Sequence, residues 1–548
     1  MNKIPVILFS LLLSINIFAQ KTNKIPPQKP KLIVSIVVEQ MKPEFLNRYW
    51  KKFDNNGFKR FFYQGTTFKY ANYNYMLTQT APGITTIVTG CNPSQHGIIS
   101  DKWIKRINNK KEDCVNSKKY KQIGFDKSYD GAMPKNILTS TITDELKINN
   151  PESKVFSISL DKTSAVLAGG HIADASFWFN ATEGKFTTSS YYLKELPKWV
   201  KKFNNKGLQD IYMQKKWETL LPIEKYTESL KDSNIYEFGI KHQIIFPYDL
   251  LKLSGNTEKN ITNYKILTET PYGNTIVHDF AISTILEQEL GKDNNTDFLS
   301  ITFSATKNID ELYGNKSVEL EDTYLRLDKD IAHLIDFINE QVGKQNVLIY
   351  LTSDHGVSDN PEYLQSMKIP AGRFKHNYSI ALLRSYLNAI YGEADWISVY
   401  MDKQIYLNHN LIEDSKIDLS EIQQRIASFI IQYDAVANAL TSTTLLKTSF
   451  NDGLLNKMQN SFNQKRSGDI IINLMPGYIE DKTYLVSSNS GYNYDTNVPL
   501  YFYGWKTKRN IITRKVNMED IAPTLSLILN IPFPNGTTGQ PINELLNK

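Results

Sequence analysis

The hydroxyl group best placed for chemistry belongs to Thr80, in the segment TQTAPGITTIVTG at residues 78–90. Pro82 and the closing Gly90 predict a helix that begins near Thr80 and ends at the glycine. The free N–H groups and the dipole at a helix N-terminus attract an anion such as phosphate. Thr80 is therefore a candidate nucleophile. The alternative is that its hydroxyl only caps the helix.

Side chains that can bind a metal follow two predicted strands. Glu39 follows the apolar run at 31–38, and Asp354 with His355 follows the run at 346–352. Such runs are typical of buried parallel strands, and ligands bind beyond the carboxyl ends of these strands. Carboxylates and imidazoles are ligands of divalent metals such as zinc. The alternative for Asp354 and His355 is a buried hydrogen bond with a purely structural role.

The elements that position these side chains alternate between strands and helices. Three further β-rich runs lie at 154–160, 297–304 and 498–503, and helical segments lie at 319–339 and 518–529. This alternation predicts an α/β fold with a doubly wound, mainly parallel sheet.

Two long stretches break this alternation, at about 165–294 and about 362–473. Both are rich in Tyr, Trp, Asn and Lys, and their periodicity is mixed. We interpret them as cap regions inserted into one domain that spans residues 31–548.

Five motifs follow one another along the chain: EDTYLRLD at 321–328, SDHG at 353–356, YDTNVPL at 494–500, DIAPT at 520–524 and PFPNG at 532–536. In content and order they resemble those of the alkaline phosphatase superfamily, which includes nucleotide pyrophosphatases and phosphodiesterases. The match is closest to bacterial periplasmic alkaline phosphatases that use threonine as the nucleophile. The resemblance implies the fold of that superfamily, a pair of zinc ions and a nucleophilic role for Thr80.

The resemblance also shows that most metal positions of that family are substituted here. One zinc site keeps Asp354 and His355, but Glu39 stands where the family has aspartate. The other site has lost all three ligands, so we expect at most one divalent metal, zinc, and no two-zinc site. Lys307 and Glu311 also lie one helical turn apart, and the alternative for them is a simple ion pair. The three lost positions hold Lys307, Glu311 and Ser488.

The positions that contact phosphate in the family are degenerate as well. A Lys-Asp-Arg sequence of the family is replaced by Asp161, Lys162 and Thr163, and an asparagine is replaced by Asp101. Two carboxylates are thus added near the position of the phosphate. Each would repel a phosphate charge by about 4 kcal/mol at a separation of ~4 Å and an effective dielectric constant near 20.

Two functional hypotheses follow from this pattern. In the first, the chain is a catalytically degenerate member of the superfamily, a pseudoenzyme with a binding or accessory role. In the second, it is a single-metal phosphate-ester hydrolase, a phosphomonoesterase or phosphodiesterase. There Thr80 is the nucleophile, and the charge of Lys307 replaces one metal ion.

The N-terminus predicts export. One lysine, a short apolar segment and Ala19 are typical of a signal peptide at residues 1–19, followed by a leader at 20–30. The apolar segment is short for a membrane anchor, which is the alternative. We therefore expect a periplasmic or secreted protein. Cys91 and Cys114 can form a disulfide in such a compartment, but the sequence does not decide it.

Composition limits the partners. The net charge is +6 at pH 7, but basic residues alternate with acidic ones, so we expect no nucleic-acid partner. The hydrophobic fraction of 41% is that of a globular chain and not of a disordered one. We expect no membrane span after cleavage of the signal peptide. The sequence leaves open whether the protein has a protein partner in the cell envelope.

Overall fold

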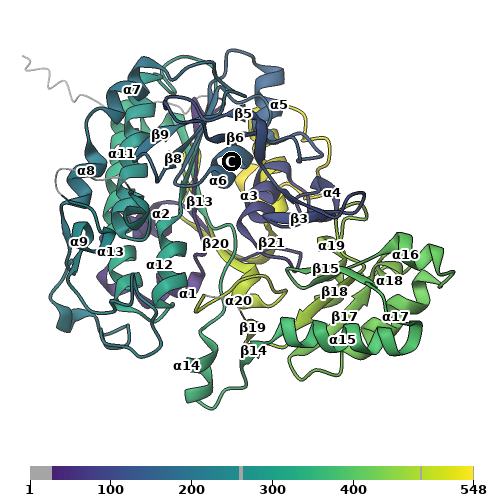
Figure 1. Cartoon of the computed structure of the whole chain (residues 1–548). Helices are drawn as coiled ribbons and strands as arrows, with labels where there is room; N and C mark the ends of the chain where they lie inside the picture. The colour runs from purple at the N-terminus through teal and green to yellow at the C-terminus, as the bar shows by residue number, and fades with distance from the viewer. Residues whose placement is uncertain (1–27, 258–262, 482–483, 547–548) are drawn as a thin grey trace, which may run out of the picture.

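The fold is built on one large mixed sheet. A computed structural model describes residues 28–257, 263–481 and 484–546, so the predicted signal peptide and most of the leader lie outside the described residues. The sheet has nine strands in the order β21-β2-β20-β13-β1-β12-β7-β8-β9. Figure 1 shows helices on both sides of this sheet.

The centre of the sheet is parallel. Strand β1 (Leu32–Val38) lies between β12 (Asp297–Phe303) and β13 (Val347–Thr352) and is parallel to both. Strands β7 (Val155–Ser159) and β8 (Ala175–Asn180) continue the parallel order. Every residue of β1 is buried, as expected for a strand covered on both faces. The predicted α/β fold with a mainly parallel sheet is confirmed.

The strand orientation predicted for residues 498–503 is wrong. Strand β20 (Asn497–Gly504) is antiparallel to β13 and to β2 (Thr66–Asn72). A strand with both faces covered gives the same apolar run in either direction, so the sequence pattern could not reveal this. The edges are β21 (Asn510–Asn517), parallel to β2, and β9 (Lys185–Thr187), antiparallel to β8.

Two hydrophobic cores separate the sheet from the helices on its two faces. This is the doubly wound arrangement expected from alternating strands and helices. The helices on one face are α1 (Pro43–Arg48), α2 (Phe58–Gln64), α11 (Pro271–Glu287) and α13 (Val318–Gln341). Those on the other are α3 (Thr80–Thr89), α5 (Ile142–Asn149), α6 (Lys162–Gly169) and α21 (Ile521–Leu529).

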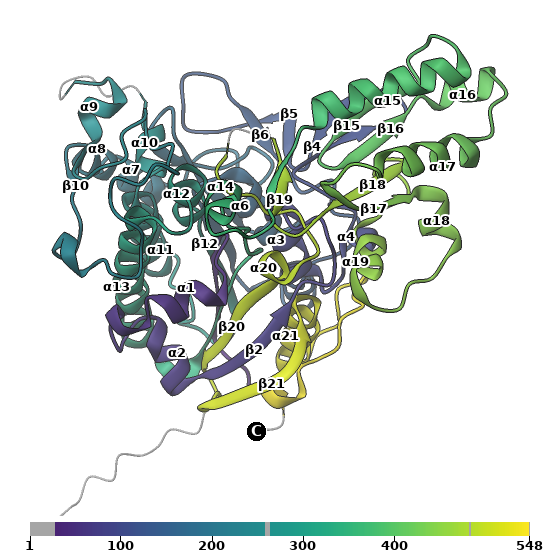
Figure 2. The same ribbon diagram turned by 90° about the horizontal axis from the view of Figure 1, so that it is seen from below.

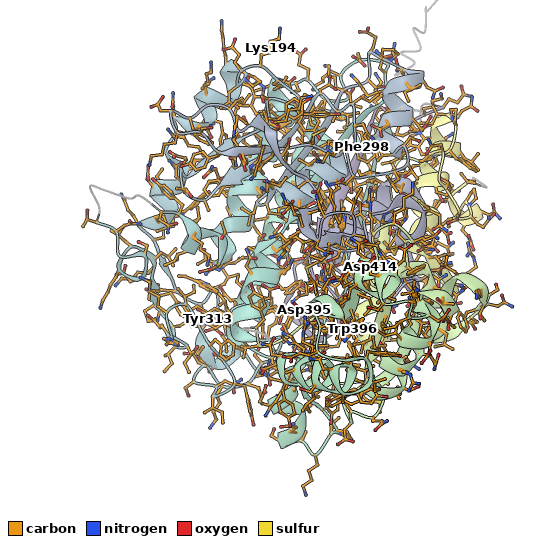
Figure 3. All side chains as sticks on the ribbon, turned by 45° about the vertical axis from the view of Figure 1, so that its right-hand side comes forward. Lys194, Phe298, Tyr313, Asp395, Trp396 and Asp414 are labelled. Atoms are coloured by element: carbon orange, nitrogen blue, oxygen red, sulfur yellow. The ribbon has the colours of Figure 1, made fainter. Side chains whose placement is uncertain are left out.

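A second unit with its own core is inserted between β13 and β20. Its four-stranded sheet has the order β15-β16-β18-β17, and α15 (His376–Tyr391) and α17 (Leu419–Ile430) pack on it. Trp396 belongs to this core, and Figure 3 shows it apart from Phe298 of the central sheet. The strands are β15 (Ile397–Met401), β16 (Gln404–Leu407), β17 (Val436–Thr441) and β18 (Ile470–Leu474).

The two predicted insertions differ in how far they leave the main body. The four-stranded unit lies within the predicted stretch 362–473, except that its last strand ends one residue later, at Leu474. The stretch 165–294 instead supplies β8, β9 and α11 to the main sheet and its covering layer, so only part of it lies outside that framework. Aromatic and polar residues are frequent in both stretches, so composition did not distinguish them. None of the helices in the described parts of the chain is long and apolar enough to cross a membrane.

A buried carboxyl beside α13 makes stability depend on pH. Burial, together with the charges of Glu319 and Asp232, raises the pKa of Glu237 from its ordinary value near 4.5 to about 10. The folded protein therefore keeps a proton that the unfolded chain loses, and stability falls as pH rises between these values. We expect a loss of the order of 4 kcal/mol between pH 6 and pH 9.

Glu237→Gln should flatten this dependence because the amide does not titrate. The measurement is the melting temperature of both proteins from pH 6 to pH 9. Glu340→Gln, at an exposed position of α13, is the matched control and should keep the wild-type slope. Parallel curves for Glu237→Gln and wild type would show that the carboxyl does not hold its proton.

Candidate functional site

The site lies where three neighbouring strands end. Glu39 follows β1, Lys307 lies in α12 (Ala305–Tyr313) after β12, and Asp354 follows β13. Because β12 and β13 flank β1 and run parallel to it, these three positions meet at one edge of the sheet. Crevices of this kind, beyond the carboxyl ends of strands, are where open α/β sheets bind ligands.

The helix predicted to begin near Thr80 is confirmed. Helix α3 begins at Thr80 and ends at Gly90, whose φ of 69° is the left-handed conformation that glycine adopts easily. Gln79 occupies the N-cap position, and its side chain makes no capping hydrogen bond to this helix. The alternative that Thr80 only caps the helix is therefore wrong. The Thr80 hydroxyl instead accepts a hydrogen bond of 3.0 Å from the ammonium group of Lys307.

Lys307 is a charged group enclosed by carboxylates. Burial by itself lowers the pKa of a lysine, but Glu311, Glu39 and Asp101 oppose this, and the pKa of Lys307 is raised overall. The amine therefore stays protonated at neutral pH. It donates a hydrogen bond to Thr80 and cannot take the proton of the threonine hydroxyl.

A second charged group fills the anion position at the start of α3. Asp101 accepts a hydrogen bond of 3.0 Å from the backbone N–H of Ala81, the second residue of the helix. Gln79 holds Asp101 in turn, because its side-chain oxygen accepts from the Asp101 N–H at 2.9 Å. Part of the helix terminus that would attract phosphate is thus already satisfied by a carboxylate of the chain itself.

A small cavity of about 130 Å³ opens over these groups. Of the predicted site residues, Thr80, Asp101, Lys307, Glu311, His355 and Ser488 line it. Glu39 and Asp354 are fully buried behind them.

The predicted metal remnant is held by hydrogen bonds within the protein. Glu39 accepts a hydrogen bond of 2.5 Å from the hydroxyl of Ser164, and burial together with Asp161 raises its pKa well above the ordinary value. Asp354 accepts from the N–H groups of Gln40 and His355, both at 2.9 Å. The distance from His355 Nε2 to Asp354 Oδ2 is 3.2 Å, and the distance from His355 Nδ1 to the Gly356 carbonyl oxygen is 2.7 Å.

These donor sets do not fit the pair of zinc ions that the superfamily resemblance implies. At the position of one ion the chain presents the Lys307 ammonium, a cation with no lone pair to give. In the described parts of the chain, no three His, Cys, Asp or Glu side chains are grouped so that they could hold a metal ion. A single metal on Glu39, Asp354 and His355 stays a prediction.

The structure does not bring Asp161, Lys162 and Thr163 into the lining of the cavity. Asp161 is the N-cap of α6 and accepts from the N–H groups of Thr163 and Ser164, at 2.8 and 3.1 Å. Lys162 donates instead to the side chain of Asn116 on β5 (Asn116–Lys121). The carboxylate in this tripeptide therefore has a structural role at the start of α6.

Comparison with known proteins places the chain in a family. Residues 33–492 match the model for type I phosphodiesterase / nucleotide pyrophosphatase. The chain belongs to this family. It is 35% identical over 535 residues to the alkaline phosphatase PafA of Elizabethkingia meningoseptica, covering 97% of this chain and 96% of that one. Superposition of this chain on the crystal structure of wild-type PafA gives a TM-score of 0.90. The match covers 95% of this chain and 99% of the PafA chain.

A second relative supports the same placement. The alkaline phosphatase PhoV of Synechococcus elongatus is 34% identical over 521 residues, which are 94% of this chain and 93% of that protein. The predicted membership of the alkaline phosphatase superfamily is confirmed.

Several site residues were missed in the sequence, among them Gln40, Asn489 and Lys403. Gln40 and Asn489 line the cavity next to predicted residues, and Asn489 has a left-handed backbone with φ of 87°. Lys403, in the turn between β15 and β16 of the inserted unit, donates a hydrogen bond of 2.6 Å to the Asn489 carbonyl oxygen. Adjacency to Glu39 and Ser488 was the available signal for the first two. No sequence pattern indicated Lys403, because its role depends on how the inserted unit docks.

The remaining residues of interest have structural roles. Cys91 and Cys114 are both buried and free in this structure. His96 is buried beside Thr86, with 3.2 Å between Nε2 and the hydroxyl, and burial lowers its pKa to about 3. His171 is 2.7 Å from the carboxylate of Asp144.

Proposed function

We propose that this protein is an exported member of the type I phosphodiesterase / nucleotide pyrophosphatase family that does not hydrolyse phosphate esters and instead has a binding or accessory role. The observation that carries the proposal is the 3.0 Å hydrogen bond from Lys307 to Thr80. A nucleophilic hydroxyl must be deprotonated as it attacks, by a base or by a metal. A protonated lysine is neither, and it stabilises the hydroxyl as an acceptor.

The charge around the cavity supports the same proposal. Among the described residues that line the cavity, Lys307 is the lysine, and two acidic residues, Asp101 and Glu311, line it as well. Asp101 already occupies an N–H group of α3 that would otherwise be available to a phosphate oxygen. A dianionic phosphate ester would therefore meet more negative than positive charge at close range, which is unfavourable. The proposal includes export by the signal peptide at residues 1–19. It also includes a protein partner in the cell envelope.

Turnover of an aryl phosphate and of a bis-aryl phosphate by the purified mature chain tests the proposal. We expect rates near background and no change on Thr80→Ala, because the hydroxyl is not activated. Rapid hydrolysis that Thr80→Ala abolishes would refute the proposal.

The same assay distinguishes this proposal from the hypothesis of a single-metal hydrolase. That hypothesis predicts slow turnover that rises on addition of zinc and is lost in both Thr80→Ala and Asp354→Ala.

A further inference from the structure

A second cavity lies away from the candidate site, on the face of the sheet that carries α1 and α2. It has a volume of about 580 Å³ and is formed by these helices with the strands β2 and β20. Figure 2 shows α1 and α2 beside these two strands. The cavity shares no lining residue with the candidate site. Its volume is in the range of ~300–1,000 Å³ typical of small-molecule sites.

Aromatic side chains form much of its wall. Trp50 and Phe62 pack edge to face, with ring centroids 5.3 Å apart, so each ring holds the other in place. Tyr70 on β2 also lines the cavity and is 54% exposed, and Tyr501 on β20 is half-buried. Aromatic faces left partly open in a concave site offer stacking surfaces to a planar ring.

The polar groups of the cavity indicate the charge of its ligand. Lys51 and Lys69 are exposed at its edge, and none of the described residues that line it is acidic. Thr67 is only 6% exposed, and its hydroxyl has no hydrogen-bond partner within the protein. A buried hydroxyl without a partner is unfavourable, so a ligand that bonds to it would gain from doing so.

We propose that this cavity binds a small organic anion with an aromatic ring, such as an aromatic carboxylate. The ring packs against Trp50 and Tyr70, the anionic group pairs with Lys51 and Lys69, and a polar atom bonds to Thr67. A sugar acid fits less well, because a sugar needs many hydrogen bonds. Besides the tyrosine hydroxyls and the indole N–H of Trp50, Asn47 and Thr67 are the uncharged polar side chains among the described lining residues.

Calorimetric titration of the mature protein with 2-naphthoate tests the proposal, with the neutral 2-naphthamide and with glucuronate as comparison ligands. We expect saturable 1:1 binding of 2-naphthoate and about tenfold weaker binding of the amide. Lys69→Glu and Tyr70→Ala should each weaken 2-naphthoate binding by about tenfold. Thr67→Val, which replaces the hydroxyl by a methyl group of similar size, should weaken it several-fold.

The controls are Lys329→Glu and Tyr378→Ala, exposed residues on α13 and α15 that do not line the cavity. Both should bind 2-naphthoate like the wild type. Equal affinities for 2-naphthoate and 2-naphthamide, preferential binding of glucuronate, or no saturable binding would each overturn the proposal. Lys69→Glu changes an exposed side chain, so a wild-type affinity in this variant, with the fold intact by circular dichroism, would also overturn it.

Discussion

Lys307→Met should lower the free energy of unfolding by about 3–5 kcal/mol, the range expected when one partner of a buried charge group is removed. The lysine is surrounded by the carboxylates of Glu311, Glu39 and Asp101, which raise its pKa despite its burial. Without the ammonium, these carboxylates repel one another in a poorly solvated space. Urea denaturation of the variant and the wild type gives the difference directly.

Two further variants show whether charge causes this loss. Lys307→Met combined with Glu311→Gln should recover part of the lost stability, because one of the carboxylates that opposed the lysine is gone. Lys329→Met, at an exposed position of α13, should change stability by no more than about 0.5 kcal/mol. If Lys307→Met is as stable as Lys329→Met, the ammonium does not neutralise the site.

Restoring the metal positions of the family should increase the amount of zinc that the site binds. The variant combines Glu39→Asp, Lys307→Asp, Glu311→His and Ser488→His. It removes the competing cation and supplies oxygen and nitrogen ligands of the kind zinc prefers. Elemental analysis should show up to two equivalents of zinc per chain, where the unaltered protein holds fewer.

Turnover should lag behind zinc binding in this variant. Asp101 would still occupy the N–H of Ala81, and the family resemblance implies that Asp161 and Thr163 replace phosphate-binding cations. Changing Asp101→Asn as well should then raise the rate. A restored variant that gains turnover without zinc would contradict this order of events.

Much of the fold was predictable because local patterns determined it. The apolar run at 31–38 forms a fully buried strand, and the segment ending at Gly90 forms a helix with the glycine in the left-handed conformation. The position of Glu39 and Asp354 at the ends of strands followed from the rule for open sheets, whereas Lys307 was placed by the family resemblance. The antiparallel direction of β20 did not follow, since an apolar run is the same in both directions.

The interior of the site was less predictable than its position. Sequence identified Asp161 as a carboxylate near the phosphate position, whereas the structure uses it to cap α6. Asp101 was expected to repel phosphate, and the structure adds that it bonds to the backbone of the nucleophile helix. The contact between Lys307 and Thr80 joins residues 227 positions apart, and no local pattern encodes such a distance.

The zinc content of the purified mature protein tests the central claim most directly. Protein prepared in the presence of zinc and then freed of loosely bound metal should hold no more than one equivalent per chain, because the family resemblance assigns Lys307, Glu311 and Ser488 to all three ligand positions of one ion. Two equivalents of zinc per chain would contradict the account, since the ammonium of Lys307 and a second ion cannot share the place next to Thr80.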